Sequence, residues 1–235
     1  MSFKDTYWNT EEVERLYKAE NPEQAIIQPI IAKQVVELNP AQILDYGCGD
    51  AYLAKILPDN INIDLYDRNQ QSLEKVFQTL NKPNCKRLYD ESDFQNDFYD
   101  CIVLSFVLVC VDSLEDQYRI LRKLRTALKK SSGTLIITNS HPCFLQYEFT
   151  AFKTNFNPEN FNYFNNGNPY EVSIKQPNGN PAVTFTDYQW QLSVWINTAI
   201  ECGFTLQEMI EVPDQPYKDL TENKLYPPFL ILKFN

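Results

Sequence analysis

The residues best suited to binding a ligand are an aspartate and two glycines near position 45. Asp45, Gly47 and Gly49 lie in the segment ILDYGCGDA (residues 43–51), and an amphipathic stretch over 51–57 follows. This order is typical of a buried parallel strand that turns into a helix whose first N–H groups and positive dipole end remain available. Glycine permits both the sharp bend and the close approach of a ligand, because it has no Cβ. The pattern predicts a site for a nucleoside-containing cofactor.

The spacing after the glycines distinguishes between cofactors. A dinucleotide site needs a small residue at the sixth position of G-x-G-x-x-G/A, where this chain has Tyr52. Asp67 ends a second apolar run over 61–66 and lies twenty positions after Gly47 (67 − 47). A carboxylate there can accept hydrogen bonds from both ribose hydroxyls of an adenosine. The sequence has no G-x-x-x-x-G-K-[ST] phosphate loop, so the ligand need not carry a pyrophosphate.

With these residues the chain resembles the class I S-adenosylmethionine (SAM)-dependent methyltransferases, strongly over positions 40–139 and more loosely over 185–235. The resemblance implies that the glycine loop holds the methionine part of SAM and that Asp67 holds the ribose. Either Asp90 or Glu91 would meet the adenine amino group. Ala51, where a third glycine is usual, is a mild departure. The predicted cofactor-binding residues are Asp45, Gly47, Cys48, Gly49, Asp67, Arg68, Asp90, Glu91, Ser105 and Phe106.

Two of these acids also have a purely structural interpretation. Asp45 could cap a helix, and Glu91 could be a solvated neighbour of Asp90 with no ligand contact. The backbone at Ser105 and Phe106, which ends the predicted fourth strand, would border the cofactor by the same resemblance.

The C-terminal part resembles a branch of methyltransferases that act on metabolites and natural products. The likeness rests on the run SHPCF over 140–144, on the pattern D-Y-x-x-x-L-x-x-W-I-N over 187–197, and on Gly203-Phe204. It implies methyl transfer to an O, N or S atom of a small-molecule acceptor, with S-adenosylhomocysteine (SAH) as product. Members often carry a His-Arg pair ahead of the helix predicted over 187–203. This chain has Thr186-Asp187-Tyr188 there, so no base is implied.

His141 is the candidate catalytic residue. It is the one histidine of the chain and follows the predicted fifth strand, where it could accept a proton from the acceptor. The alternative is that His141, next to Pro142, shapes the loop through hydrogen bonds. Aromatic side chains could line an acceptor site or could be the core of a lid. The predicted substrate-binding residues are Tyr7, Trp8, Tyr147, Tyr163, Tyr170 and Trp195.

The composition limits the class of acceptor. Of 235 residues, 31 are acidic and 21 basic, giving a net charge of −10, and 43% are apolar. A nucleic-acid binder normally carries a basic face that neutralises phosphates. The main concentration of positive charge fits the solvated face and C-terminal end of a helix over 114–130. It comprises Arg119, Arg122, Lys123, Arg125, Lys129 and Lys130.

Cysteine usage and hydropathy indicate the compartment. The six cysteines are scattered without a C-x-x-C pair, which favours reduced, buried thiols over disulfides or a metal site. No apolar stretch reaches 18 residues, and no secretory signal is visible at the N-terminus. We therefore expect a cytoplasmic protein without metal or membrane contact; the sequence does not indicate an oligomeric state.

Alternating strand and helix patterns must position these residues. Strands are predicted over 41–46, 61–66, 85–89, 99–105 and 133–139, and helices over 23–38, 51–57, 69–80 and 114–130. Such alternation predicts a parallel sheet built from right-handed crossovers. The resemblance implies a Rossmann-like α/β fold with a seven-stranded, mostly parallel sheet whose last strand is antiparallel, and with helices on both faces. The final two strands are predicted over 204–212 and 228–234, after a helix from Asp187, its expected N-cap, to Cys202, with Gly203 as its C-cap.

An aromatic-rich insertion interrupts the alternation after the fifth strand. It contains a predicted hairpin over 169–186 that turns at 177–180. We expect a single domain, 1–235, with an N-terminal helical cap over 1–38 and a lid over 140–186 that covers the carboxyl ends of the strands.

Two rival functions remain open. A nucleic-acid or peptide methyltransferase of the same fold is the first. A base-flipping enzyme would carry [DNS]-P-P-[YFW] after the fourth strand, where Ser105-Phe106-Val107-Leu108 stands. The second is a non-catalytic SAM-binding module, against which the large aromatic insertion argues.

Overall fold

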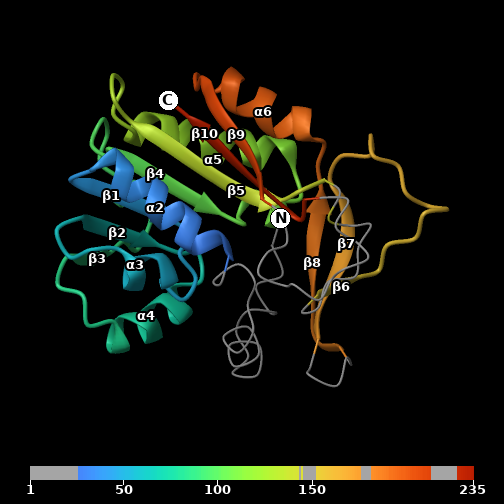
Figure 1. The fold of residues 1–235 in the computed structure, drawn as a ribbon, viewed down its shortest axis with the longest axis horizontal. Helices are drawn as coiled ribbons and strands as arrows, with labels where there is room; N and C mark the ends of the chain where they lie inside the picture. The colour runs from blue at the N-terminus through green and yellow to red at the C-terminus, as the bar shows by residue number, and fades with distance from the viewer. Residues whose placement is uncertain (1–25, 143, 145–151, 176–180, 213–226) are drawn as a thin grey trace.

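A seven-stranded sheet organises the chain (Figure 1). The computed structural model describes residues 26–142, 144, 152–175, 181–212 and 227–235. The strand order is β3-β2-β1-β4-β5-β10-β9, and β10 is antiparallel to both of its neighbours, as predicted. The strands are β1 (Gln42–Tyr46), β2 (Asn62–Tyr66), β3 (Cys85–Arg87), β4 (Cys101–Ser105), β5 (Thr134–Ser140), β9 (Leu206–Val212) and β10 (Phe229–Phe234).

Helices cover both faces of this sheet, because its central strands are apolar on both sides. On one face, α2, α3 and α4 pack with Ile43 and Val103 in the first core cluster. On the other, α5 and α6 pack with Leu44 and Leu104 in the second. The helices are α2 (Gln28–Leu38), α3 (Tyr52–Ile56), α4 (Gln70–Thr79), α5 (Leu114–Ala127) and α6 (Leu192–Glu201), with short 3₁₀ turns η2 (Glu91–Asp93) and η3 (Leu108–Cys110).

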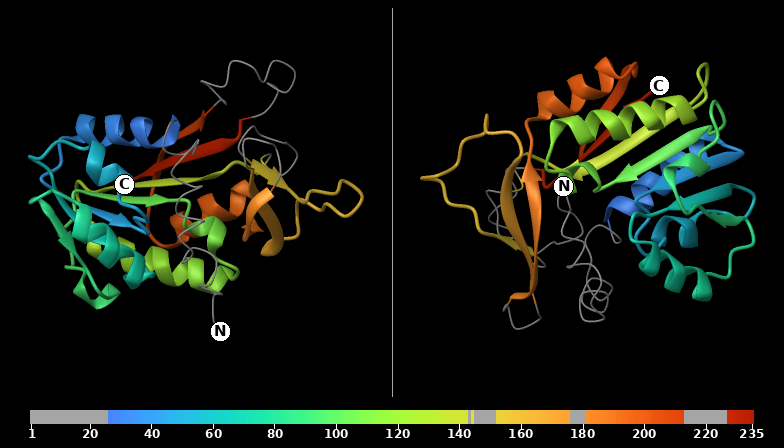
Figure 2. Two further views of the ribbon diagram at one scale, coloured as in Figure 1. Left: turned by 90° about the horizontal axis from the view of Figure 1, so that it is seen from below. Right: turned by 180° about the vertical axis from the view of Figure 1, so that it is seen from behind.

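A second, three-stranded antiparallel sheet stands beside the carboxyl ends of β4 and β5 (Figures 1 and 2). It consists of β6 (Phe152–Thr154), β7 (Asn168–Lys175) and β8 (Pro181–Gln189). Its buried side chains Tyr170, Val172 and Phe185 belong to the first core cluster. The pairing of β7 with β8 confirms the predicted hairpin, and β8 continues to Gln189, beyond the expected end of the insertion at 186.

The helix expected from Asp187 begins later. Asp187 pairs with Tyr170 in the β7–β8 ladder, so it is a strand residue and not an N-cap. The N-cap position belongs to Gln191, which makes no side-chain capping bond, and α6 starts at Leu192. Its end agrees with the prediction, because Gly203 follows the last turn with φ +90°. Of the expected cap over 1–38, residues 1–25 lie outside the described part.

Candidate cofactor and acceptor site

The glycine loop bends over the carboxyl end of β2. The N–H groups of Gly47 and Cys48 both donate to the carbonyl of Tyr66, at 2.7 and 3.1 Å. Gly47 has φ +76°, and a Cβ there would lie 2.4 Å from Val107 Cγ2. Gly49 has φ +53°, but a Cβ built on it would meet no atom within 4 Å. The first glycine is therefore required by packing, whereas the second borders open space.

Asp67 is tied to this loop by its side chain. The N–H of Gly49 donates to Asp67 Oδ2 at 2.9 Å, and the N–H of Asn69 donates to Oδ1 at 2.8 Å. A carboxylate oxygen can accept two hydrogen bonds, so these contacts are compatible with further bonds from ribose hydroxyls. The loop after β1 and the residue after β2 thus form one connected unit.

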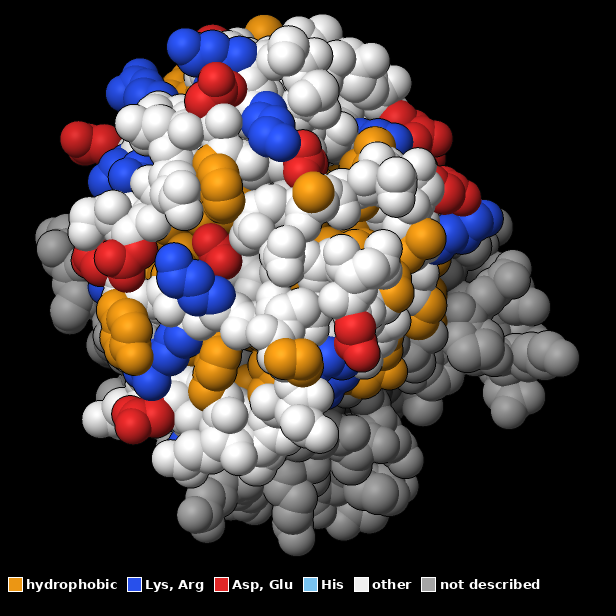
Figure 3. Space-filling view, turned by 90° about the vertical axis from the view of Figure 1, so that its left-hand side faces the viewer, with side chains coloured by type: hydrophobic (Ala, Val, Ile, Leu, Met, Phe, Trp, Pro, Cys, Tyr) orange, Lys and Arg blue, Asp and Glu red, His pale blue; other side chains and the backbone are white. Residues whose placement is uncertain are grey.

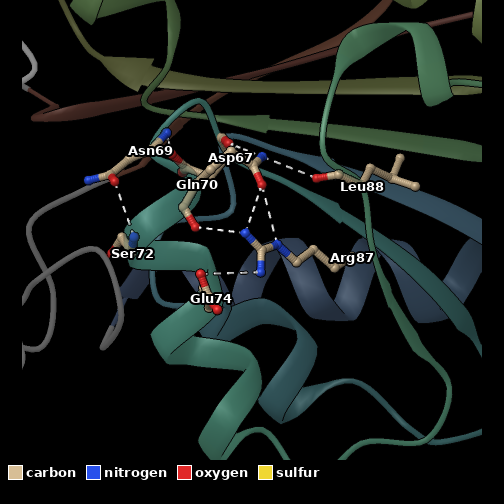
Figure 4. A network of polar contacts seen from close by, with 7 residues as sticks. All are labelled: Asp67, Asn69, Gln70, Ser72, Glu74, Arg87 and Leu88. Atoms are coloured by element: carbon tan, nitrogen blue, oxygen red, sulfur yellow. Dashed lines mark hydrogen bonds and ion pairs between the residues drawn. The ribbon is translucent and has the colours of Figure 1, made fainter.

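A polar network holds that unit against β3 (Figure 4). The Gln70 amide donates to the carbonyls of Asp67 and Leu88, at 2.8 and 3.2 Å. Arg87 donates to the Gln70 carbonyl at 2.9 Å and lies 3.9 Å from Glu74. Because α4 begins within this network, the carboxyl ends of β2 and β3 are fixed relative to each other.

Asp45 is a buried carboxylate at the end of β1, only 4% exposed. Burial, followed by the charges of Asp67 and Asp50, raises its pKa to about 7. No hydrogen bond to this carboxylate occurs among the described residues, so the helix-cap interpretation finds no support. The loop is an anionic environment that would favour a cationic group of a ligand.

The two acids after β3 differ in their surroundings. Glu91 accepts hydrogen bonds on both oxygens, from the Tyr46 hydroxyl at 2.6 Å and from Arg119 at 2.8 Å. Asp90 is exposed and accepts the N–H of Ser92 at 2.8 Å, and this hydrogen bond lowers the pKa of its carboxyl group. Asp90 is therefore the better placed of the two to meet a ligand.

The remaining predicted cofactor residues border the same end of the sheet. Ser105 ends β4, and its hydroxyl accepts a bond from the Gln28 amide at 3.5 Å. Phe106 has φ +54°, and its ring packs edge-on against Phe229 at 5.7 Å. Cys48 is buried, which raises the pKa of its thiol, whereas Arg68 is exposed.

His141 follows β5, and its ring is turned toward β9. The ring Nε2 lies 3.2 Å from Glu211 Oε1, and the backbone N–H of His141 donates to the Pro228 carbonyl at 2.8 Å. On β9, Glu211 pairs with Leu230 of β10, and Leu230 packs in the second core cluster with α5 and α6. Burial lowers the pKa of the imidazole, against the opposing effect of Glu211. These contacts favour the structural alternative for His141.

The predicted substrate-binding aromatics fall into separate places. Tyr170 lies on the buried face of the small sheet, in the first core cluster. Trp195 lies on α6 in the second cluster, and Tyr163 accepts the N–H of Leu192 at the start of α6, at 3.1 Å. The structure therefore does not bring these three together. Tyr7, Trp8 and Tyr147 lie outside the described residues.

The sequence patterns did not identify three polar residues that lie near the carboxyl ends of the strands. Gln28, which is half-buried, interrupts the apolar face of α2, and the fully buried Thr138 follows the apolar run of β5; a polar residue within an apolar pattern is the signal that could have identified both. Asp187, 5% exposed, accepts a weak hydrogen bond from the Cys110 thiol at 3.7 Å. Its resemblance to a helix N-cap concealed it.

Comparison with known proteins agrees with this geometry. A sequence model of the methyltransferase domain family matches residues 14–167, more than half of the chain. A search of curated proteins found no match.

Three solved structures illustrate the likeness of fold. An S-adenosylmethionine-dependent methyltransferase from Clostridium acetobutylicum is 13% identical, with a TM-score of 0.64 and coverage of 94% of this chain and 96% of that one. The CcbJ methyltransferase from Streptomyces caelestis is 14% identical, with a TM-score of 0.64 and coverage of 94% of each chain. The glycopeptide N-methyltransferase MtfA is 11% identical, with a TM-score of 0.63 and coverage of 97% and 98%. At these identities the likeness concerns the fold.

Proposed function

The chain belongs to the methyltransferase domain family, and from this premise we propose that it transfers a methyl group from S-adenosylmethionine to an O, N or S atom of a small-molecule acceptor. The observation that carries the proposal is the second sheet. It packs its buried face into the core beside the carboxyl ends of β4 and β5, where ligands bind in open α/β sheets.

The residues at the glycine loop fit SAM. Open space at Gly49 admits a ligand close to the backbone, and the buried Asp45 carboxylate suits the cationic groups of SAM. In this proposal Asp67 holds the ribose, Asp90 the adenine amino group, and the loop with Asp45 the methionine part. When bound, SAM supplies a methyl group already activated by the positive sulfur.

The protein's own contribution is positioning and the exclusion of water. Tyr170, Val172 and Phe185 form the buried face of the small sheet, and their packing in the first core cluster holds that sheet beside the strand ends, where an acceptor would bind in this proposal. In this proposal Tyr170 belongs to the acceptor site, whereas the contacts of Tyr163 and Trp195 support a structural role in positioning α6. A lid function for residues 140–186 belongs to the same proposal.

Charge argues against a nucleic-acid acceptor. Arg119 pairs with Glu91 at 2.8 Å and Lys129 with Asp100 at 2.5 Å, so part of the basic cluster is neutralised within the chain. On the face at the amino ends of the strands, acidic and basic side chains are interspersed without a basic patch (Figure 3). No helix in the described ranges has the length and apolar character needed to cross a membrane.

Release of SAH tests the proposal. The chain would be incubated with SAM in separate reactions that contain a metabolite panel, a peptide mixture or transfer RNA. We expect SAH release that depends on a small molecule. Release only with peptide or RNA would overturn the proposed acceptor class, and binding of SAM without release under any condition would favour a non-catalytic module.

A further inference from the structure

A buried carboxylate lies on the inner face of the small sheet. Asp187 pairs with Tyr170 in the β7–β8 ladder and is only 5% exposed. Side chains alternate along a strand, so Asp187 shares its face with Phe185, and Tyr170 shares the same face with Val172. Phe185 and Val172 are both buried in the first core cluster. The Asp187 carboxylate is therefore a polar group on the otherwise apolar face that packs against the rest of the domain.

Side chains from three other elements surround this carboxylate. The Sγ of Cys110, in η3, lies 3.7 Å from Asp187 Oδ1 and 3.4 Å from the carbonyl oxygen of Phe106, the residue that follows β4. Tyr170 is directly opposite on β7, with its Cβ about 5 Å away. The Tyr170 hydroxyl accepts a hydrogen bond from the side chain of Ser140, which ends β5. Asp187, Cys110, Tyr170 and Ser140 thus form one polar cluster, the Asp187 cluster.

The Asp187 cluster lies on the acceptor side of the strand-end site. Ser140 ends β5, and β4 lies between β5 and β1, whose end carries the glycine loop. Cys110 and Phe106 are half-buried, so the cluster is not closed off from solvent on the side of η3. Ligands of open α/β sheets bind at the carboxyl ends of the strands. The cluster is therefore one strand away from the cofactor loop and separate from it.

The charges that act on this cluster are negative. Burial, followed by the charge of Asp187, raises the pKa of Tyr170 well above its usual value. Burial, followed by Asp112, Cys110 and Asp187, likewise raises the pKa of Tyr188, the next residue on β8. Among the described residues, no basic side chain contributes to either shift. The electrostatic environment thus favours a positively charged group of a ligand.

The chemistry of the cluster selects an amine. An ionised carboxylate has about four lone-pair sites, so the contact of Asp187 with the thiol is compatible with a further hydrogen bond from a ligand. An ammonium group supplies three donors and a positive charge, whereas a carboxylate would be repelled and a neutral hydroxyl would form a weaker bond. Building on the proposed function, we propose that Asp187 binds a positively charged amino group of the acceptor, so that the acceptor is an amine-bearing small molecule.

Analogues of SAH with a third arm test this inference without turnover. Their sulfur is replaced by nitrogen, and an ethyl, propyl or butyl arm takes the place of the transferred methyl group. Each arm ends in an amino, a hydroxyl or a carboxylate group, and binding is measured by calorimetry. We expect the native chain to bind an amino arm of at least one length at least about tenfold more tightly than the hydroxyl arm of that length, and the carboxylate arm most weakly.

Two variants assign the preference to Asp187. In Asp187→Asn the preference for the amino arm should fall below about twofold, while SAH binds as it does to the native chain. Asp112→Asn is the matched control, because it removes the same charge from an exposed neighbour that water screens. The preference should change less than about twofold in that variant.

Three results would overturn the inference. Equal binding of amino and hydroxyl arms at every length would show that no amine is recognised, and this comparison uses the native chain alone. A preference that persists in Asp187→Asn would assign the amine to another group. Equal weakening of SAH and all of the analogues in Asp187→Asn would show that the residue acts through the shape of the site. The proposed function fails by a separate result, which is that no small molecule supports SAH release.

Discussion

The two halves of the strand-end site are built in different ways. The cofactor half, at the ends of β1, β2 and β3, consists of turns that directly follow their strands: Gly47 after β1, Asp67 after β2 and Asp90 after β3. The acceptor half joins β5, η3 and the small sheet, and brings Cys110 next to Asp187 from distant parts of the sequence. The difference indicates that the cofactor half is set by local chain geometry, whereas the acceptor half depends on how the insertion packs.

The largest effect should come from the first glycine. In Gly47→Ala the new Cβ meets Val107 in a left-handed conformation, so we expect the free energy of unfolding to fall by at least about 2 kcal/mol. Urea unfolding measures this. Gly49→Ala has the same type of conformation but no clash, and should cost about half as much. Adding Val107→Ala should restore part of the loss in the first variant; equal costs for the two glycines would contradict the packing role of Gly47.

Removing Asp67 should come next. Asp67→Ala eliminates the proposed ribose contacts and the partner of the Gly49 N–H, so SAM affinity should fall at least tenfold, about 1.4 kcal/mol, by titration calorimetry. Asp59→Ala is the matched control, because Asp59 is paired with Lys82 near the amino end of β2. An unchanged affinity in Asp67→Ala would mean that the ribose lies elsewhere.

Asp45 makes cofactor binding depend on pH. With its pKa raised to about 7, protonation removes the negative charge that favours the cationic cofactor. Affinity should therefore fall roughly tenfold between about pH 7.5 and about pH 6, and Asp45→Asn should be weaker at the higher pH but nearly independent of pH. A native profile that is flat across this range would contradict the role of Asp45.

The raised pKa of Asp45 also makes the free energy of unfolding depend on pH. The folded chain holds the Asp45 proton more tightly than the unfolded chain, so the contribution of this group to stability falls as pH rises from about 4 to about 7 and is level above. Comparing the urea unfolding of native protein and Asp45→Asn across this range isolates the effect.

A smaller difference should separate the two acids after β3. Asp90→Asn should weaken SAH binding about threefold or more, because the exposed carboxylate is the proposed adenine contact. Glu91→Gln should change affinity less than about twofold, since both Glu91 oxygens are engaged by Tyr46 and Arg119. Calorimetry with SAH decides the matter, and the reverse order would assign the adenine contact to Glu91.

In the acceptor half, replacing His141 tests whether this residue is structural or catalytic. If its contact with Glu211 is structural, His141→Asn should lower the free energy of unfolding by about 1 kcal/mol and leave SAH binding unchanged. Turnover with an acceptor from the panel should then stay within about threefold. A loss of about 100-fold at unaltered stability would instead support His141 as the proton acceptor.

The sequence predicted the cofactor half because each apolar run ends where a strand ends. The positions of Gly47, Asp67 and Asp90 follow from that alternation, and the reversed direction of β10 came from the family resemblance. Contacts between segments that are distant in the sequence could not be predicted from these patterns. The engagement of Glu91 with Tyr46 and Arg119 spans distant segments, and Asp187 looks like an N-cap until its pairing with Tyr170 is known. The direction of the His141 ring likewise depends on β9, far along the chain.

A crystal structure of the chain with SAH tests the central claim most directly. We expect the ribose hydroxyls within hydrogen-bonding distance of the Asp67 carboxylate and the homocysteine part against the Gly47–Gly49 loop. A nucleoside bound at any other place, or a failure of SAH to bind at all, would contradict this account.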